Sequence, residues 1–411
     1  MSNRPPANPS PADDKITPVE LPRPFWILFA GTLINRTGGF VIIFLAIYLT
    51  EVRGLSPSEA GVIISAYGFG AVFAGPIGGA LSDRIGRRVT LVASLVTGGI
   101  SMIALGRAGA AGLPVMAAIT GLFYEMYRPV VSATIADIVA PSNRARAYSL
   151  NYWAVNLGAS VAPLLGSAIA ARSYQLMFVI DGLTAVAYGV LLLLALPETQ
   201  PTAVAGRNAD AMTILRDRPF LVFCLLTFGI HLVFFQFFVG LPVDMRAHGV
   251  STSAYGALVA INPILVVLLQ IPAGELIARR SQTRVLSLAS LLIGTGFGCM
   301  AWSGSRAAYV VGIVLFTLGE ILFAPASVAF VADVSPAEAR GRYQGAFALA
   351  FTTAFAAAPA VGGYVLSAAG GFWLWMGCLM IGVLVALGFL FVDLGSRLTA
   401  QGSRLKQNAW P

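Results

Sequence analysis

The amino-acid sequence predicts an all-α integral membrane protein, with twelve transmembrane helices arranged as two pseudo-symmetric six-helix bundles. Three observations support this fold class. The 411-residue chain is 57% hydrophobic and 11% charged, whereas a soluble chain carries about a quarter charged residues. Twelve apolar stretches are each near or above the roughly 20 residues that a membrane-spanning helix needs. The second set of six stretches repeats the first in sequence, as expected of a duplicated unit.

The apolar stretches define the expected domain organisation. Between the two sets lies a polar segment at 197–218 that contains Pro, Gly and charges, which we interpret as a linker. The expected helices are 24–50, 56–80, 89–108, 112–138, 147–170 and 174–196, then 219–243, 254–278, 284–303, 307–333, 343–367 and 371–393. The expected domains are an N-terminal tail at 1–22, a bundle at 23–196, the linker, a bundle at 219–393 and a C-terminal tail at 394–411.

Three matches show the internal repeat. The segment "GLSPSEAG" at 54–61 matches "GVSTSAYG" at 249–256, and "ADIVAPSNRARAYS" at 136–149 matches "ADVSPAEARGRYQG" at 332–345. Pro163 and Gly166 likewise match Pro359 and Gly362, and the offset is 195 or 196 residues throughout. Duplicated six-helix units are typical of secondary transporters, in which the substrate site lies near the bilayer midplane between the repeats.

The positive charges predict the orientation in the membrane. The net charge of +8 would suit a nucleic-acid partner, but the distribution of the 26 Lys and Arg residues argues against one. If the N-terminus is cytoplasmic, five arginines fall on the outer side: Arg53, Arg107, Arg172, Arg246 and Arg306. Two more lie within the membrane, and all the others are cytoplasmic, as the positive-inside rule requires. We therefore expect a multi-pass protein of the cell inner (plasma) membrane with both termini in the cytoplasm.

The loop between the second and third helices carries a specific motif. The segment "GALSDRIGRRVTL" at 79–91 resembles the loop signature G-x-L-x-D-R-x-G-R-R-x-x-L of the major facilitator superfamily at every defined position. The matching residues are Gly79, Leu81, Asp83, Arg84, Gly86, Arg87, Arg88 and Leu91. Glycine permits a tight turn and a close approach of helices. The resemblance, which covers nearly the whole chain and is greatest to the drug/proton antiporter branch, implies a latch between the halves in the outward-facing state.

Two details qualify the latch. Asp137, at the cytoplasmic end of the fourth helix, is the expected partner of Arg84 or Arg87; the alternative is that these arginines only anchor the topology. The second-half counterpart, "GELIARRSQTRVLS" at 274–287, lacks the Asp and the second Gly. We therefore expect an asymmetric latch.

The fifth helix carries a second motif, "NLGASVAPLLGS" at 156–167. It resembles the G-x-x-x-G-P-x-x-G antiporter motif of exporters in the family through Gly158, Pro163 and Gly166, with Ala162 in place of one glycine. Small residues at this spacing let helix backbones approach closely, and an internal proline can kink a helix. Pro359 and Gly362 repeat the pattern in the eleventh helix. Ordinary tight packing is the alternative interpretation.

Ionisable residues inside the expected helices are candidates for function, because a charge at the bilayer centre costs about 3 kcal/mol or more. These residues are Arg36, Glu125, Arg128, Asp181, His231 and Glu320. The offset from Arg36 to His231 is 195 residues, and so is the offset from Glu125 to Glu320. Each half therefore presents one cationic or titratable group and one carboxyl group at equivalent positions near the midplane.

The two carboxyl groups have different expected partners. Glu125 and Arg128 share a helix face at i,i+3 spacing, and Arg36 is expected to add a second positive charge. Glu320 has apolar residues where Arg128 would be, so its nearest candidate partner is His231. We predict Glu320 as the leading proton site, sharing its proton with His231, and Glu125 as the second candidate. The alternatives are a structural Glu125–Arg128 ion pair and a His231 that is an ordinary core residue.

Two further residues are weighed for proton coupling. Asp181 is a weaker candidate, expected either to pair with Arg36 or to face extracellular water. Arg128 lies in the region of the fourth helix where the resembling family often has an arginine linked to proton coupling.

Aromatic, amide and basic residues near these charges suit a small amphipathic substrate. The candidates are Arg36, Arg128, Tyr124, Tyr127, Tyr152, Asn156, Gln236 and Asn262. The expected partners are this substrate, protons and membrane lipids, and we expect a monomer. No nucleic-acid partner, metal ion or other cofactor is expected.

The sequence contains no Gly-rich phosphate loop, no H-E-x-x-H and no Cys/His cluster, so an enzyme is not predicted. The leading hypothesis is a proton-driven exporter of drugs or natural products. The alternatives are a proton symporter that takes up a small polar or anionic solute, a flippase for a lipid-linked substrate, and a membrane sensor that has kept the fold.

Overall fold

The computed structural model describes residues 21–199, 217–277, 280–302, 305–336 and 339–407. All regular structure in these ranges is helical. In the first half, the elements are α1 (Arg23–Gly38), α2 (Val41–Ile47), η1 (Tyr48–Val52), α3 (Pro57–Ile85), α4 (Arg87–Arg107), η2 (Ala110–Gly112), α5 (Leu113–Ile138), η3 (Pro141–Asn143), α6 (Arg144–Ala170) and α7 (Tyr174–Ala195). In the second half, they are α9 (Arg218–Phe234), η4 (Phe235–Phe237), α10 (Gly240–Ala247), α11 (Thr252–Ile277), α12 (Gln282–Gly298), η5 (Cys299–Trp302), α13 (Arg306–Val334), α14 (Arg340–Ala369) and α15 (Gly371–Gln407).

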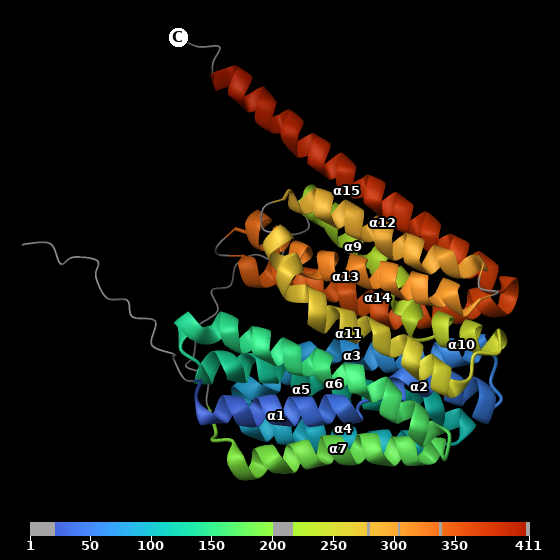
Figure 1. The fold of residues 1–411 in the computed structure, drawn as a ribbon. Coiled ribbons are helices and arrows are strands. Elements are labelled where there is room, and N and C mark those ends of the chain that lie inside the picture. The colour runs from blue at the N-terminus through green and yellow to red at the C-terminus, as the bar shows by residue number, and fades with distance from the viewer. Residues whose placement is uncertain (1–20, 200–216, 278–279, 303–304, 337–338, 408–411) are drawn as a thin grey trace, which may run out of the picture.

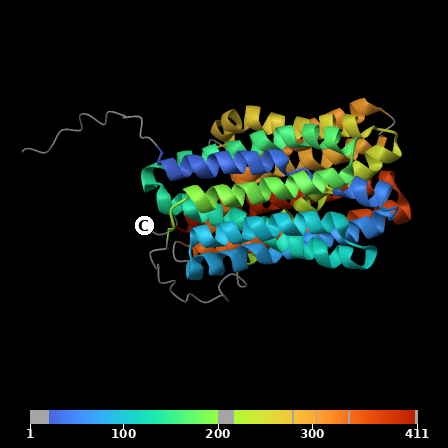
Figure 2. The same ribbon diagram turned by 90° about the horizontal axis from the view of Figure 1, so that it is seen from below.

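The helices form two layers, one from each half of the chain (Figure 1). Seen from below, the rods still run along one common direction (Figure 2). α1 begins and α7 ends at the same end of the bundle, here called the terminus end, and α15 extends past it (Figure 1). The far end, where α2 and α10 lie, is called the opposite end. This arrangement confirms the predicted fold class.

Eleven helical segments of the described residues are long and apolar enough to cross a membrane. The expected helix at 112–138 is not among them, although its counterpart α5 is a continuous helix of 26 residues. α5 contains Glu125 and Arg128, and it packs chiefly against α3 and α4. It is therefore the twelfth helix of the bundle, and its Glu125 and Arg128 line a cavity.

The first and seventh expected helices are broken rather than continuous, although the predicted spans 24–50 and 219–243 each lie within one candidate membrane span, Arg23–Val52 and Arg218–Ala247. α1 ends at Gly38 and α2 begins at Val41, while α9 passes through η4 before α10. Backbone groups freed in a membrane must find partners inside the protein. The Asp181 carboxylate accepts a hydrogen bond from the Val41 N–H at 2.9 Å, and Gln236 Nε2 donates to the Leu232 and Ala358 carbonyls at 3.1 and 3.0 Å.

The repeated motifs pack against each other across the two halves. A Cβ atom at Gly61 would lie 2.3 Å from the Pro359 carbonyl oxygen, and one at Gly256 would lie 2.5 Å from the Pro163 carbonyl oxygen. Gly61 and Gly256 are equivalent in the repeat, and so are Pro163 and Pro359. The first contact joins α3 to α14 and the second joins α6 to α11, so the interface between the halves is itself pseudo-symmetric.

Polar contacts also join the halves, and three of them lie at the opposite end. Arg246 forms an ion pair with Glu51 at 2.5 Å. The Tyr255 hydroxyl donates to the Ile43 carbonyl at 2.8 Å, and the Ser58 N–H donates to the Ser367 hydroxyl at 3.0 Å. The opposite end is thus closed by direct contacts between the two halves.

Candidate functional site

Two equivalent carboxyl groups lie inside the bundle, and each receives a hydrogen bond from an equivalent donor. The Tyr67 hydroxyl of α3 donates to Glu125 of α5 at 2.8 Å. Asn262 Nδ2 of α11 donates to Glu320 of α13 at 2.7 Å. Donor and acceptor are 58 residues apart in both halves. The repeat has therefore kept the geometry of the pair while changing the donor from a phenol to an amide.

The first-half carboxylate has a second partner, as predicted. Arg128 Nε lies 2.9 Å from Glu125 Oε2, so both Glu125 oxygens are engaged. Glu125 has 15% of its side chain exposed, whereas Arg128 has 51%. The charge that this pair presents to its surroundings is therefore the guanidinium rather than the carboxylate.

Arg36 does not join this pair, contrary to expectation. Its guanidinium lies over the Tyr127 ring, 5.7 Å from the centroid, and the ion pairs of the described residues do not include it. The Gly158 backbone packs on the Arg36 stem, where an added Cβ would lie 2.5 Å from Arg36 Cβ. Close packing of α6 on α1 thus directs the guanidinium toward an aromatic face.

Asp181 neither pairs with Arg36 nor faces water, which corrects both expectations. It is 1% exposed. Its two oxygens accept hydrogen bonds from the Tyr124 hydroxyl at 2.6 Å and from the Val41 N–H at 2.9 Å. Asp181 therefore caps the N-terminus of α2 at the break in the first rod, where the helix dipole favours a negative charge. Its predicted part in proton coupling stays untested.

His231 is not the partner of Glu320, which corrects the predicted shared-proton pair. Its Nδ1 hydrogen-bonds the Thr227 carbonyl at 2.7 Å. The imidazole ring packs against the rings of Phe323 and Phe351, with centroids 5.3 and 4.8 Å apart. His231 and Glu320 nevertheless line the same cavity. Tyr127 and Phe323 are equivalent, since each lies two residues before a proline of its helix. The contact of His231 with the Phe323 ring therefore repeats the contact of Arg36 with the Tyr127 ring.

Two cavities contain the equivalent carboxyl groups, and a third adjoins them. The largest, of about 560 Å³, lies between α6, α11 and α13 near the terminus end and includes Tyr152, Trp153, Asn156 and Gln270. The second, of about 270 Å³, contains His231 and Glu320. The third, of about 280 Å³, contains Glu125 and Arg128. The first two share Ala324 and Val328, and the last two share Phe351, so the cavities adjoin one another.

The predicted substrate residues fall into two groups. Tyr152, Asn156 and Arg128 line cavities. Five others line none of these three cavities: Arg36, Tyr124, Tyr127, Gln236 and Asn262. Tyr124 holds Asp181, and Asn262 holds Glu320. The sequence analysis did not identify Tyr67 as the Glu125 donor; the 195-residue offset to Asn262 is the signal that could have found it.

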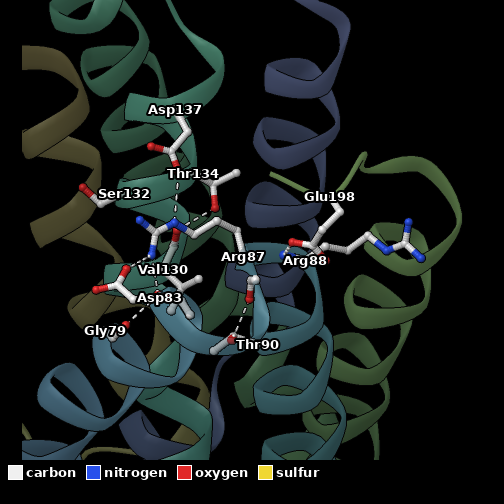
Figure 3. Close-up of polar contacts among 12 residues, drawn as sticks. Gly79, Asp83, Arg87, Arg88, Thr90, Val130, Ser132, Thr134, Asp137 and Glu198 are labelled. Carbon is white, nitrogen blue, oxygen red and sulfur yellow. Dashed lines mark hydrogen bonds and ion pairs between the residues drawn. The ribbon is translucent and has the colours of Figure 1, made fainter. Parts of the chain in front are cut away.

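The loop motif forms a cluster at the terminus end (Figure 3). Arg87 Nε lies 2.9 Å from Asp137 Oδ2, and Arg87 Nη1 lies 2.6 Å from Asp83 Oδ1. The contact with Asp137 was one of the two predicted; Arg84 is exposed and is not the residue that pairs with Asp137. All three residues belong to α3, α4 and α5, so the cluster is closed within the first half. A latch between halves stays a prediction.

The loop glycines Gly86 and Gly79 differ in whether the structure has room for a side chain. Gly86 has φ +99°, and a Cβ atom there would lie 2.5 Å from Glu198 Oε1. The Glu198 carboxylate accepts hydrogen bonds from the Arg88 and Val89 N–H groups at 3.0 and 3.3 Å, which caps α4 (Figure 3). Gly79 has no atom within 4 Å of an added Cβ, so the close approach expected there is absent. The sequence analysis did not foresee the cap from Glu198.

The equivalent segment of the second half, 274–287, has a contact that corresponds to Arg87 with Asp137, but a neutral glutamine replaces the arginine. Gln282 Nε2 donates to Asp333 Oδ2 at 2.6 Å. Gln282 is equivalent to Arg87, and Asp333 is equivalent to Asp137. Part of this counterpart, at 278–279, lies outside the described residues. The cluster is therefore asymmetric, as the sequence predicted.

The predicted packing motif makes close contacts at each glycine. A Cβ atom at Gly166 would lie 2.8 Å from Phe40 and Phe44, beside the break between α1 and α2. One at Gly362 would lie 1.8 Å from Gln236 Oε1, beside the equivalent break in the second half. The motif therefore allows the broken first and seventh helices to pack closely against α6 and α14. Its value as a sign of export stays a prediction.

The sequence matches the profile of the Major Facilitator Superfamily over residues 28–246 and 237–408. The chain belongs to the major facilitator superfamily. It is therefore a multi-pass membrane protein and a secondary transporter, not an enzyme, and it acts on a small-molecule substrate.

Comparison with curated proteins shows distant relatives. The chain is 27% identical over 336 residues to the uncharacterized MFS-type transporter YqjV of Bacillus subtilis (strain 168), covering 78% of this chain and 81% of the relative. It is 24% identical to the Na(+), Li(+), K(+)/H(+) antiporter of Planococcus maritimus, covering 79% and 85%. It is 24% identical to the multidrug resistance protein MdtH of Escherichia coli (strain SE11), covering 86% and 90%.

Solved structures show the same fold. A POT family transporter in complex with 5-aminolevulinic acid superposes with a TM-score of 0.78 at 14% identity, covering 90% of this chain and 96% of that one. The nucleoside transporter NupG gives 0.78 at 14% identity, covering 90% and 100%.

Proposed function

We propose that this chain is a proton-coupled exporter of small amphipathic compounds that works by alternating access. The observation that carries the proposal is the difference between the equivalent carboxyl groups. Glu125 is held by a fixed cation, whereas Glu320 has a neutral amide donor and faces a cavity. A carboxyl group without a fixed cation can gain and lose a proton during a transport cycle, which an ion-paired one does less readily.

The cavities support an amphipathic substrate. Their walls combine aromatic rings with a few polar groups, which is typical of sites that bind an apolar body and orient a polar head. The largest cavity lies near the terminus end while the opposite end is closed by contacts such as Glu51 with Arg246. If the positive-inside rule holds, the terminus end is cytoplasmic and this conformation faces inward. An exporter loads its substrate in that state.

Two relatives are consistent with export. MdtH is named for multidrug resistance, and the relative from Planococcus maritimus is named as a cation/proton antiporter. An uptake symporter for an anionic solute is the second candidate, and it is favoured by one observation: Arg128 is half exposed in a cavity. We further propose a monomer in the plasma membrane with two domains at 23–196 and 219–393 and with both termini cytoplasmic.

Transport by purified protein in proteoliposomes, with a pH-sensitive dye in the lumen, tests the proposal. A panel of aromatic amphiphiles is added while lumenal pH is recorded. An exporter reconstituted with its cytoplasmic face outward moves protons out as substrate enters, so the lumen becomes alkaline; a symporter acidifies it. Glu320→Gln should abolish the pH change, and Glu320→Asp, which keeps a carboxyl group, should retain part of it.

The Asp variant is the matched control for the Gln variant. Equal loss in both variants, at unchanged thermal stability, would assign Glu320 a role in shape rather than in proton transfer. A wild-type signal in Glu320→Gln would remove it as the proton site.

A further inference from the structure

The cavity around Arg128 has an unequal distribution of charge. Glu125 and Arg128 cancel formally, but the Glu125 oxygens are occupied by Tyr67 and by Arg128 Nε. The exposed part of the pair is the guanidinium, with 51% of the Arg128 side chain exposed. Nε is used in the ion pair, and the two terminal nitrogens are the donors that a guanidinium offers to a planar anion. The pair thus holds Arg128 in place and leaves its donor end available.

The walls of the same cavity determine what else a ligand must have. The first half contributes Arg128, Glu125 and small residues of α3, including Ala71, Ala74 and Gly75. The second half faces them with four phenylalanines: Phe235, Phe238, Phe351 and Phe355. The space is about 280 Å³. It therefore combines an oriented cation on one side with an aromatic wall on the other.

The second half supports the contrast. The position equivalent to Arg128, counted back from the matching prolines, is Ala324. Among the described residues, Glu320 accepts a hydrogen bond from Asn262 and pairs with no arginine. The Arg128 cavity therefore contains an arginine that the equivalent Glu320 cavity lacks. A ligand with a negative head would be attracted to the Arg128 side and repelled by an ionised Glu320.

We propose that Arg128 is the anion-binding residue of this transporter and that its substrates are aromatic or apolar compounds carrying a carboxylate, sulfonate or phosphate group. This inference rests on the proposed transport function and specifies its substrate class. The acidic group lies against the terminal nitrogens of Arg128, and the apolar body lies against the phenylalanine wall.

Equilibrium binding to the purified full chain in nanodiscs tests the inference with matched probes. Calorimetry compares naphthalenesulfonate with naphthalenesulfonamide, which has nearly the same shape but no charge, and with naphthyltrimethylammonium. We expect the wild type to bind the sulfonate at least about 10-fold more tightly than the sulfonamide. Equal affinity for the two, or a preference for the cation, would overturn the proposal.

Variants separate recognition from folding. Arg128→Gln should weaken sulfonate binding about 10-fold or more while leaving sulfonamide binding unchanged, and Arg128→Lys should be intermediate. Glu125→Gln should strengthen sulfonate binding, because it removes the opposing charge. Arg306→Gln, an exposed arginine at the opposite end, is the control and should change nothing. If Arg128→Gln weakens all three probes equally, the residue is structural and the inference fails.

Lipid composition distinguishes a soluble anion from a lipid headgroup. In nanodiscs containing phosphatidylglycerol, sulfonate affinity equal to that in phosphatidylcholine indicates a soluble ligand, whereas competition that depends on Arg128 indicates a headgroup. Either result supports an anion site. The proteoliposome assay is read separately: sulfonate binding without a pH change would leave the anion site standing and contradict proton-coupled export.

Discussion

Glu51 and Arg246 occupy equivalent positions in the two repeats, 195 residues apart, and they form an ion pair with each other across the opposite end of the bundle. Arg246 Nη2 also donates to Glu51 Oε2 at 3.2 Å, so the contact is bidentate. One element of each half, η1 and α10, carries the pair. The pseudo-twofold relation between the halves thus brings one position of the repeat into contact with its own copy.

Breaking this pair should open the opposite end. Both side chains are partly exposed, so the contribution of the pair is about 1 kcal/mol or less. Arg246→Gln is therefore expected to shift the conformational equilibrium by about 5-fold at most toward the state open at that end. Spin-label distances between the halves measure the shift. The double exchange Glu51→Arg with Arg246→Glu should restore the wild-type distances; failure to restore them would show that the pair does not hold the end closed.

The packing of Gly256 on the Pro163 carbonyl should be needed for the same closure. A side chain at this glycine cannot fit, because its Cβ would lie 2.5 Å from the carbonyl oxygen. Gly256→Val should separate α11 from α6 and cost more than the ion pair, about 1–3 kcal/mol. The spin-label distances should lengthen at the opposite end. Gly274→Ala, on the same helix with no atom near its Cβ, is the control, and distances that lengthen equally in both variants would contradict the argument.

Gly86 and Gly79 should respond differently to alanine although both belong to the loop motif. Gly86→Ala places a side chain at a φ of +99° and against Glu198, so it should destabilise the protein by about 1–3 kcal/mol. Gly79→Ala lies inside α3 with free space around it and should be neutral or stabilising by up to about 1 kcal/mol. Thermal unfolding in detergent, followed by tryptophan fluorescence, compares them. A larger loss for Gly79→Ala would contradict the structure.

Asp181 and Glu320 should be separable by the same amide substitution. Asp181→Asn weakens two buried hydrogen bonds to a charged group, so it should lower stability by about 1–3 kcal/mol. Proton coupling should persist in it, because Asp181 caps α2 and lines none of the three cavities. Unfolding midpoints and lumenal pH changes, measured on the same preparations, decide the matter. Lost coupling at unchanged stability would instead make Asp181 a proton carrier, as the sequence suggested.

Predictions within one helix succeeded, and several predictions between helices failed. The i,i+3 spacing placed Arg128 beside Glu125 because a single helix fixes that geometry. Glu320 was assigned to His231 because both lie at midplane depth, yet its partner is Asn262. The position of a residue along its helix gives its depth in the membrane. It does not give the rotation of the helix, which determines the neighbour that the side chain faces. The two breaks in the first and seventh rods were also missed, since hydropathy does not register a short gap in an apolar run.

The sequence by itself determined the number of rods, the duplication, the family and the positions of the charges, because hydrophobic length and repeat offset are properties of the chain alone. Only the tertiary structure decided which donor faces which carboxyl group. That choice depends on how closely the helices approach at residues such as Gly158 and Gly256, which sets their rotation and register. Tyr67 therefore reaches Glu125, and Asn262 reaches Glu320, through packing that no single segment encodes.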